Sequence, residues 1–185
     1  MDQMMSEQIE NIRKNPNSVN WGCISAYQKL SEDFIREFKG SVKWSFISKY
    51  QKLSEEFILE FKLTISGNNW QYKSKEFVFD FIKNKTSYEV VDDEVIAYKS
   101  CRSDGYSKFN FQYFYEVGRV YESNADCNAD NDNSFGLSAW TKDKAIEYCE
   151  EKLFKVAIKV EDIACIVHDG NKIRARKIRI VEEIL

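Results

Sequence analysis

The chain of 185 residues contains a single histidine, His168, which limits the catalytic and metal chemistry that its side chains can support. A metal centre built on several imidazoles is excluded, and a serine or cysteine nucleophile activated by histidine would have to use this one residue. No Gly-x-Ser-x-Gly or other nucleophile motif accompanies it. Since His168 stands beside an Asp169-Gly170 turn, we interpret it as a solvated residue at that turn.

One acidic segment has the alternating spacing of a calcium-binding loop. Its oxygen-bearing side chains are Asp126, Asn128, Asp130 and Asp132. The rest of the loop pattern is missing, because Asn131 stands where glycine makes the sharp turn and Leu137 where a bidentate glutamate closes the site. We interpret the segment as a solvated loop and predict no structural metal.

The cysteines give no sign of a metal or redox site. They are odd in number and scattered, at positions Cys23, Cys101, Cys127, Cys149 and Cys165. No Cys-x-x-Cys pair is present, so we expect reduced and mostly buried thiols.

A basic stripe lies near the C-terminus, at Lys172, Arg174, Arg176, Lys177 and Arg179. It could contact phosphates, but no aromatic stacking platform is evident among these residues. Alternating charges also keep sheet edges from pairing, so we predict an exposed edge strand. Apolar and charged residues alternate along the stripe, but the alternation shifts by one position within it. We therefore expect a β-bulge near Arg176-Lys177 that returns the apolar side chains to one face.

Composition and charge are those of an ordinary globular protein. Hydrophobic residues make up 43% and charged residues 31%. Residues 1–86 contain 13 basic and 11 acidic side chains, and residues 87–185 contain 14 and 19, so neither half has the field of a dedicated nucleic-acid binder. No stretch approaches the ~20 apolar residues of a membrane span, and the first residues lack a secretory signal. We expect an intracellular protein with a protein partner.

The first half contains a tandem repeat. A shift of 23 residues superposes Trp21, Ile24, Tyr27, the run Gln28–Glu32, Phe34, Ile35 and Phe38 on Trp44, Ile47, Tyr50, Gln51–Glu55, Phe57, Ile58 and Phe61. Both apolar and polar positions recur, so we predict stacked helix–turn–helix units.

Each unit has the pattern of two short helices. Ser31 followed by acids predicts an N-cap, and Trp21, Ile24 and Tyr27 are expected on the inner side of the first helix. Degenerate copies begin at Ser6 and at Ser74, and the second of these lacks a first helix because Trp70 stands only four residues before Ser74. We predict that the repeated Trp and Phe residues form the core.

The repeat Trp-x-x-Ile-Ser-x-Tyr-Gln-Lys-Leu-Ser-Glu-x-Phe-Ile-x-Glu-Phe resembles one found in many uncharacterised proteins of giant DNA viruses of the mimivirus group. The match is close over residues 17–62 and loose over 1–86. The resemblance implies a viral origin and contact with a host protein, and it carries no catalytic residues.

The second half has the two-residue rhythm of strands. We predict strands at 95–98, 109–115, 119–121, 136–140 and 154–160, a loop at 122–134, and a hairpin of 163–167 with 172–184 about the Asp169-Gly170 turn. A helix opens at Thr141, with Ala145, Ile146, Cys149 and Leu153 on its inner face.

Segments 115–122, 136–148 and 172–177 resemble a small uncharacterised domain of phage, bacterial and giant-virus proteins, over residues 94–184. Many members have Gly-Phe-His where this chain has Gly136-Leu137-Ser138, so a role of that histidine does not carry over. The strand at 136–140 and the helix after it also resemble, more loosely, the part of ADP-ribosyltransferases that holds nicotinamide. That resemblance implies a cleft holding Tyr98, Trp140 and Tyr148. No His-Tyr-Glu or Glu-x-Glu set is assigned, although Glu182 and Glu183 are present.

The sequence therefore predicts an α+β protein, with helical repeats and capping units at 1–86 and a mostly antiparallel sheet with one helix at 87–185. The preferred hypothesis is a non-enzymatic viral interaction module that binds a host or viral protein, in the host cytoplasm or the virion, with no cofactor and no membrane or nucleic-acid partner. The alternative is a degenerate ADP-ribosyltransferase-like enzyme that uses NAD.

Overall fold

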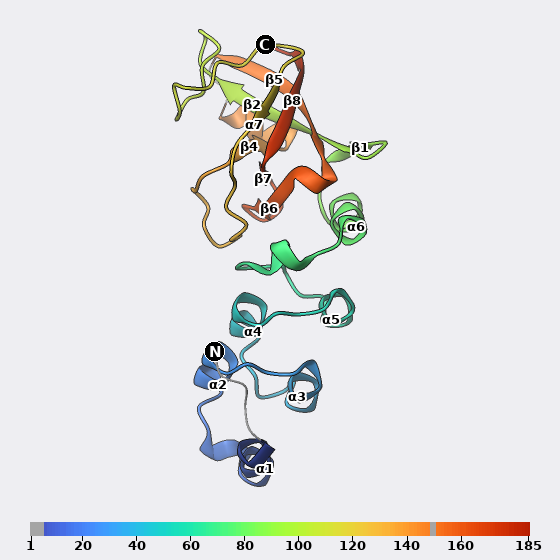
Figure 1. Ribbon diagram of the computed structural model, residues 1–185, viewed down its shortest axis with the longest axis vertical. Helices are drawn as coiled ribbons and strands as arrows, with labels where there is room; N and C mark the ends of the chain where they lie inside the picture. Colours follow the sequence, from blue (N-terminus) through green and yellow to red (C-terminus); the bar gives the residue numbers. More distant parts are fainter. Residues whose placement is uncertain (1–5, 149–150) are drawn as a thin grey trace. The chain divides into compact units, whose positions relative to one another are not determined.

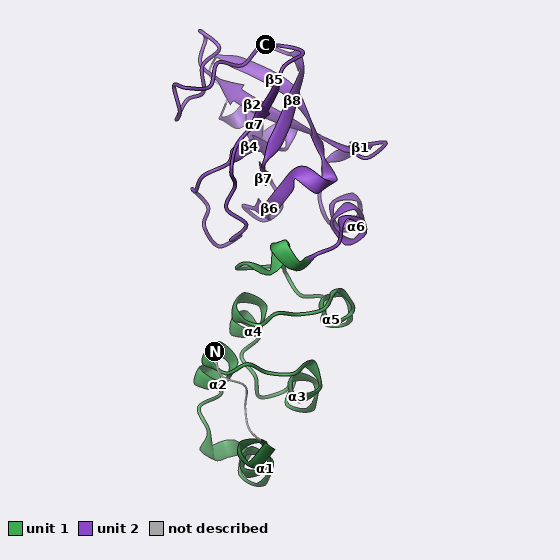
Figure 2. Ribbon diagram, viewed as in Figure 1, with its two compact units in different colours: residues 1–72 green, residues 73–185 purple. Residues whose placement is uncertain are grey.

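The computed structural model describes residues 6–148 and 151–185. Helices occupy the N-terminal part and an antiparallel sheet with one helix the C-terminal part, which confirms the α+β prediction (Figure 1). The chain divides into two compact units, residues 1–72 and 73–185 (Figure 2). The helix at 75–85 therefore belongs with the second unit by its contacts, whereas the sequence groups it with the repeats.

The first compact unit, here called the repeat unit, contains short α-helices and two 3-10 helices. They are α1 (Ser6–Lys14), η1 (Pro16–Ser18), α2 (Trp21–Tyr27), α3 (Glu32–Glu37), α4 (Trp44–Tyr50), α5 (Glu55–Phe61) and η2 (Asn69–Tyr72). Each predicted helix–turn–helix is present, as α2–α3 and α4–α5. The first helices α2 and α4 lie side by side, and the second helices form another row with α1 (Figure 1).

Serine caps begin the second helices, as predicted. The hydroxyl of Ser31 accepts a hydrogen bond from the Phe34 amide (3.2 Å), and that of Ser54 accepts one from Phe57 (3.1 Å). Each cap satisfies a backbone donor that the first helical turn leaves without a partner.

A tryptophan marks the start of each unit. The indole N–H of Trp21 donates to the Pro16 carbonyl (2.9 Å), Trp44 donates to Lys39 (3.1 Å) and Trp70 donates to Ile65 (3.2 Å), each acceptor being five residues earlier. The same bond at Trp70 indicates that a third repeat begins there. The single turn η2 then takes the place of its first helix.

The repeated aromatic rings pack together. Phe34 and Phe57 are buried, and Trp21 and Trp44 lie 5.1 and 4.8 Å from the rings of Phe38 and Phe61. These rings pack beside buried aliphatic side chains such as Ile35 and Ile47, and together they supply the apolar contacts that such short helices need in order to be stable. The prediction of an aromatic core is confirmed for Phe34 and Phe57, whereas Phe38, Phe61 and the two tryptophans are half-buried.

The second compact unit, here called the sheet unit, begins with α6 (Lys75–Lys85) and contains an eight-stranded antiparallel sheet. The strands are β1 (Glu89–Val91), β2 (Glu94–Cys101), β3 (Val120–Glu122), β4 (Leu137–Trp140), β5 (Lys152–Lys159), β6 (Ile163–Val167), β7 (Lys172–Ala175) and β8 (Lys177–Glu183). Their order is β3-β8-β5-β2-β4-β7-β6, with β1 on β2. Helix α7 (Lys142–Glu147) contacts β2 and β4, and the 3-10 helix η3 (Val160–Asp162) joins β5 to β6.

Both faces of the sheet bury apolar side chains where β2 pairs with β5. Val95 and Ala97 of β2 pair with Ile158 and Val156 of β5, and all four are fully buried. On the other face Ile96 pairs with Ala157, and Tyr98 pairs with Lys155 on one side and with Trp140 on the other.

The predicted strand at 109–115 is wrong. This segment is a loop, pinned at its base by a single bridge between Tyr106 and Phe114. Its turn is made locally, because the side chain and carbonyl of Asn110 accept hydrogen bonds from the Gln112 and Tyr113 amides. Phe109 is consequently 96% exposed.

The helix after Thr141 is shorter than predicted. It ends at Glu147, Leu153 belongs to β5, and Cys149 lies outside the described residues. Of the predicted inner face Ala145 is buried, whereas Ile146 is exposed.

The predicted bulge at Arg176-Lys177 is replaced by a change of strand partners. β7 pairs with β4 and β6 and ends at Ala175, and β8 starts at Lys177 and pairs with β3 and β5. Ile173 and Ile178 are both buried, so the interruption resolves the slip in rhythm without a bulge at that point. The prediction of an edge strand is wrong for both strands of the stripe, because β7 lies between β4 and β6 and β8 lies between β3 and β5.

Candidate binding surface

Large aromatic side chains are exposed on the first helices of the repeats. Tyr27 at the end of α2 is 69% exposed and Tyr50 at the end of α4 is 41% exposed, and the two occupy the same position of the repeat. Phe46 and Tyr72 are exposed as well. The expectation that Tyr27 lies on the inner side of its helix is therefore wrong.

These exposed rings are organised by short contacts. Phe46 lies edge-on to Tyr50 with 6.0 Å between ring centres, and its ring reaches across to α2, where a Cβ on Gly22 would stand 3.6 Å from it. The Lys49 ammonium lies 5.5 Å from the Tyr50 ring and the Lys52 ammonium 4.4 Å from that of Tyr72. Cation–π contacts of this kind favour a defined ring orientation at an exposed site.

The three residues predicted for a cleft do come together. Tyr98 and Trp140 are opposed across β2 and β4, and the Trp140 ring is 5.1 Å from that of Tyr148. Cations flank them, since Lys142 lies 5.8 Å from the Tyr98 ring and Lys172 lies 5.0 Å from that of Trp140. The result is a self-packed aromatic cluster with a half-exposed Tyr148.

His168 adds to this cluster, so the interpretation of a solvated histidine at the turn holds only in part: the residue lies at the turn and its side chain is 33% exposed, but one ring nitrogen is buried. Its ring lies 5.2 Å from that of Trp140, and its Nε2 atom is buried, 3.9 Å from a carboxylate oxygen of Asp132. Its backbone φ of 51°, followed by 52° at Asp169, belongs to the left-handed region. Gly170 completes the turn at 91°, where a side chain would be strained.

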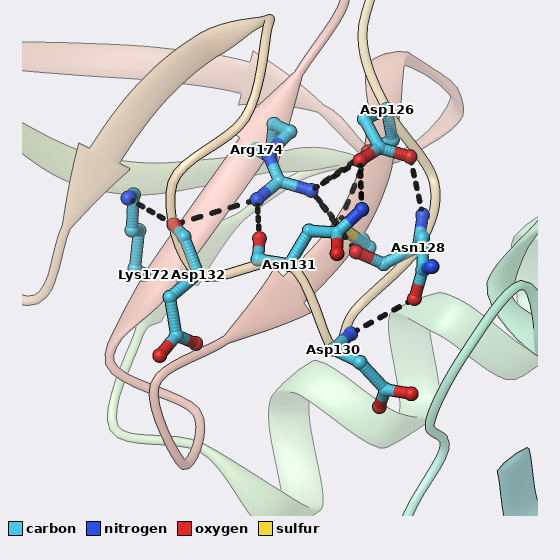
Figure 3. Close-up of polar contacts among 8 residues, drawn as sticks. Asp126, Asn128, Asp130, Asn131, Asp132, Lys172 and Arg174 are labelled. Carbon is cyan, nitrogen blue, oxygen red and sulfur yellow. Dashed lines mark hydrogen bonds and ion pairs between the residues drawn. The ribbon is translucent and has the colours of Figure 1, made fainter.

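The Asp126–Asp132 loop encloses the fully buried guanidinium of Arg174 (Figure 3). Its Nη1 donates to the carbonyls of Asp126 (3.0 Å) and Asn128 (3.2 Å), and its Nη2 donates to the carbonyl of Asn131. Lys172 donates to the Asp132 carbonyl at 2.7 Å. Backbone oxygens thus surround an internal cation in the segment whose spacing resembles a calcium loop.

The acidic side chains of this loop hold its backbone. The Asp126 carboxylate accepts from the Asn128 amide (2.9 Å) and from the Asn131 side chain (2.9 Å). The Asn131 and Asn128 hydrogen bonds are the main reason that the pKa of Asp126 is below its usual value. The prediction of a solvated loop is right for the exposed Asp130 and Asp132 side chains and wrong for the carbonyls that face Arg174.

Lys99 is a buried cation outside the basic stripe, and sequence reasoning missed it. Its Nζ donates to the Ser138 carbonyl at 2.9 Å and lies 4.9 Å from the Tyr115 ring. Burial lowers the pKa of Lys99. The signal was present in the sequence, because Lys99 shares its parity along β2 with the buried Val95 and Ala97.

The described cysteines show no sign of a reactive or metal-binding role. The described thiols form no disulfide, Cys23 is exposed, and Cys101 and Cys165 are buried. Burial raises the pKa of the Cys165 thiol to about 11, and its sulfur receives a hydrogen bond from Arg174 at 3.3 Å. A thiol with so high a pKa is a poor nucleophile.

Two broader findings concern the described residues, 6–148 and 151–185. No three His, Cys, Asp or Glu side chains among them gather closely enough to hold a metal ion. None of their helices has the length and apolar character needed to cross a bilayer.

Comparison with known protein-family models, with curated proteins and with solved structures found no match to this chain.

Proposed function

We propose that this chain is a non-enzymatic binding protein whose helical repeats present a surface to a protein partner. The observation that carries the proposal is the exposure of Tyr27 and Tyr50 at one repeated position, next to neighbours that are buried. Tyrosine supplies a large contact area at low conformational cost, and exposed clusters of apolar side chains mark interaction sites. The resemblance of the repeat to giant-virus proteins favours a host or viral partner.

The scaffold beneath these rings suits recognition. Gln51 and Asn69 are buried and bond to the preceding unit, so the exposed rings stand on a fixed frame. A pre-ordered surface loses little conformational entropy when it binds.

The test is affinity capture with the full chain from infected host cells, read by quantitative mass spectrometry. The bait carries Tyr27→Ala and Tyr50→Ala, and the control carries Phe109→Ala, an exposed aromatic of the second unit. We expect a specific protein to be recovered with wild type and control but depleted with the double variant. Equal recovery with all three baits would contradict the proposal.

The contact between Trp140 and Tyr148 favours one alternative, an ADP-ribosyltransferase-like enzyme that uses NAD. Titration of the chain with NAD, followed by tryptophan fluorescence and calorimetry, separates the two functions. Saturable binding that is lost in Trp140→Ala would support the enzyme, and its absence would support the binding protein.

A further inference from the structure

Charge is segregated between the two rows of helices in the repeat unit. Segments 15–31, 38–54 and 61–72, which hold the first helices, contain lysines and no acidic residue. These lysines are Lys29, Lys39, Lys43, Lys49, Lys52 and Lys62, and all are exposed. Every acid among residues 6–72 lies on α1, α3 or α5. One row is therefore basic and the other carries all the carboxylates.

Two arginines of the second row pair with carboxylates of that row. Arg13 joins Glu37 at 2.7 Å, and Arg36 joins Glu60 at 2.9 Å, one repeat further on. The pKa of Glu37 is lowered by its hydrogen bond to Arg13. These two arginines link α1 to α3 and α3 to α5, so the bonded carboxylates are engaged within their own row, while lysines are the only charged side chains of the first-row segments.

The lysines and the exposed tyrosines coincide at the C-terminal ends of the first helices. We define the basic aromatic row as Tyr27, Lys29, Phe46, Lys49, Tyr50, Lys52 and Tyr72. Tyr27 and Lys29 recur as Tyr50 and Lys52, so the same pair of side chains is offered in successive repeats. The contact between Lys52 and the Tyr72 ring extends the row into the third unit.

We infer that the basic aromatic row binds an acidic polypeptide segment that carries aromatic or large apolar side chains. Charge complementarity selects carboxylates for the lysines, and the tyrosine and phenylalanine rings select apolar groups between them. This inference rests on the proposed function and names the class of partner.

A peptide fits this row better than a nucleic acid does. Residues 1–72 contain nine basic and nine acidic side chains, so the unit as a whole has no positive field to hold a polyanion. A short acidic segment meets only the local charge of the row, since charges beyond about 8–10 Å are screened at physiological salt.

The test measures fluorescence anisotropy of a fluorescein-labelled peptide of repeated Glu-Glu-Phe titrated with the full chain. We expect saturable binding that weakens with salt and falls by ~10-fold or more in the Lys29→Glu, Lys52→Glu double variant. Tyr27→Ala with Tyr50→Ala should weaken it as well. Lys14→Glu and Leu59→Ala, exposed residues of α1 and α5, serve as matched controls and should bind as wild type does. Circular dichroism confirms that each variant is folded.

Three results would overturn the inference: no saturable binding of the peptide, equal weakening by Lys14→Glu, or displacement of the peptide by oligothymidylate at lower concentration than by unlabelled peptide. The last result would identify a nucleic-acid surface. If capture from cells depends on Tyr27 and Tyr50 but not on Lys29 and Lys52, the proposed function stands and this inference fails. If capture depends on none of them, both fail.

Discussion

Gln51 in the repeat unit and Arg174 in the sheet unit are both almost completely buried, and both donate hydrogen bonds to backbone carbonyls. Gln51 reaches Ser25 and Gln28 at 2.9 and 2.8 Å and accepts from the Leu30 amide at 3.1 Å. One repeat later Asn69 bonds in the same way to Ser48 and Leu53. Arg174 has no such counterpart.

The difference lies in the charge and the sequence separation of the partners. Gln51 is neutral and bonds to residues 21 to 26 positions away, about one repeat. Arg174 is a cation whose acceptors at Asp126 and Asn128 are 48 and 46 positions away. A neutral amide can be reused in every repeat at little cost, whereas a buried cation requires a cage assembled once by the whole fold.

The largest effect should come from the repeat core. Phe57→Ala removes a fully buried ring that packs on Phe61 and Trp44, and we expect it to lower the free energy of unfolding by ~3–5 kcal/mol. Urea denaturation followed by circular dichroism measures this. Leu59→Ala, on the exposed side of the same helix, is the control. A loss below ~1 kcal/mol would show that the ring does not carry the core.

Arg174→Met should be nearly as damaging to the sheet unit, at ~3 kcal/mol, because the loop carbonyls lose their donors. Arg119→Met, at a side chain that is 67% exposed, is the control and should change stability by less than ~0.5 kcal/mol. Hydrogen exchange should show that residues 126–132 lose protection first. Unchanged protection there would mean that the loop is held without the guanidinium.

Gln51→Ala tests the neutral link and should cost ~1–3 kcal/mol, since the Leu30 amide and the Ser25 and Gln28 carbonyls lose their partner. Asn69→Ala should behave alike because it makes the equivalent bonds. If only one of the two variants is destabilised, the links are not equivalent.

Lys99→Met tests the burial of the Lys99 ammonium through the pH dependence of the free energy of unfolding. The pKa of Lys99 is below its ordinary value of 10.5 in the folded chain, so between the two values the unfolded chain binds more protons and the free energy of unfolding rises with pH. We expect this rise to be smaller in Lys99→Met than in wild type over the alkaline range. Identical pH profiles would place the ammonium in solvent.

The smallest expected effect is that of chelation. Because the Arg174 guanidinium occupies the centre of the Asp126–Asp132 loop, EDTA should leave the Tm unchanged. A fall of several degrees, reversed by added Ca²⁺, would mean that the loop takes a metal as well.

The sequence by itself determined the features that depend on near neighbours. The repeat of 23 residues, the caps at Ser31 and Ser54 and the strands about the 163–167 hairpin follow from hydrophobic period and local hydrogen bonds, which act over a few residues. The pairing of β2 with β4 brings Tyr98 and Trp140 together, a grouping expected from a resemblance and not from any local pattern.

Only the tertiary structure determined which cations of the basic stripe are buried. The sequence pattern of the basic stripe predicts an exposed edge strand, yet Lys172 and Arg174 are buried. The Asp126–Asp132 loop folds back over β7 and supplies carbonyl acceptors for both side chains. The break at Arg176 similarly depends on which strands are available to pair with β7 and β8. The burial of Lys172 and Arg174 is set by acceptors about 40 or more positions away in the chain, so the local pattern of the stripe does not reveal it, in contrast to Lys99, whose parity along β2 does.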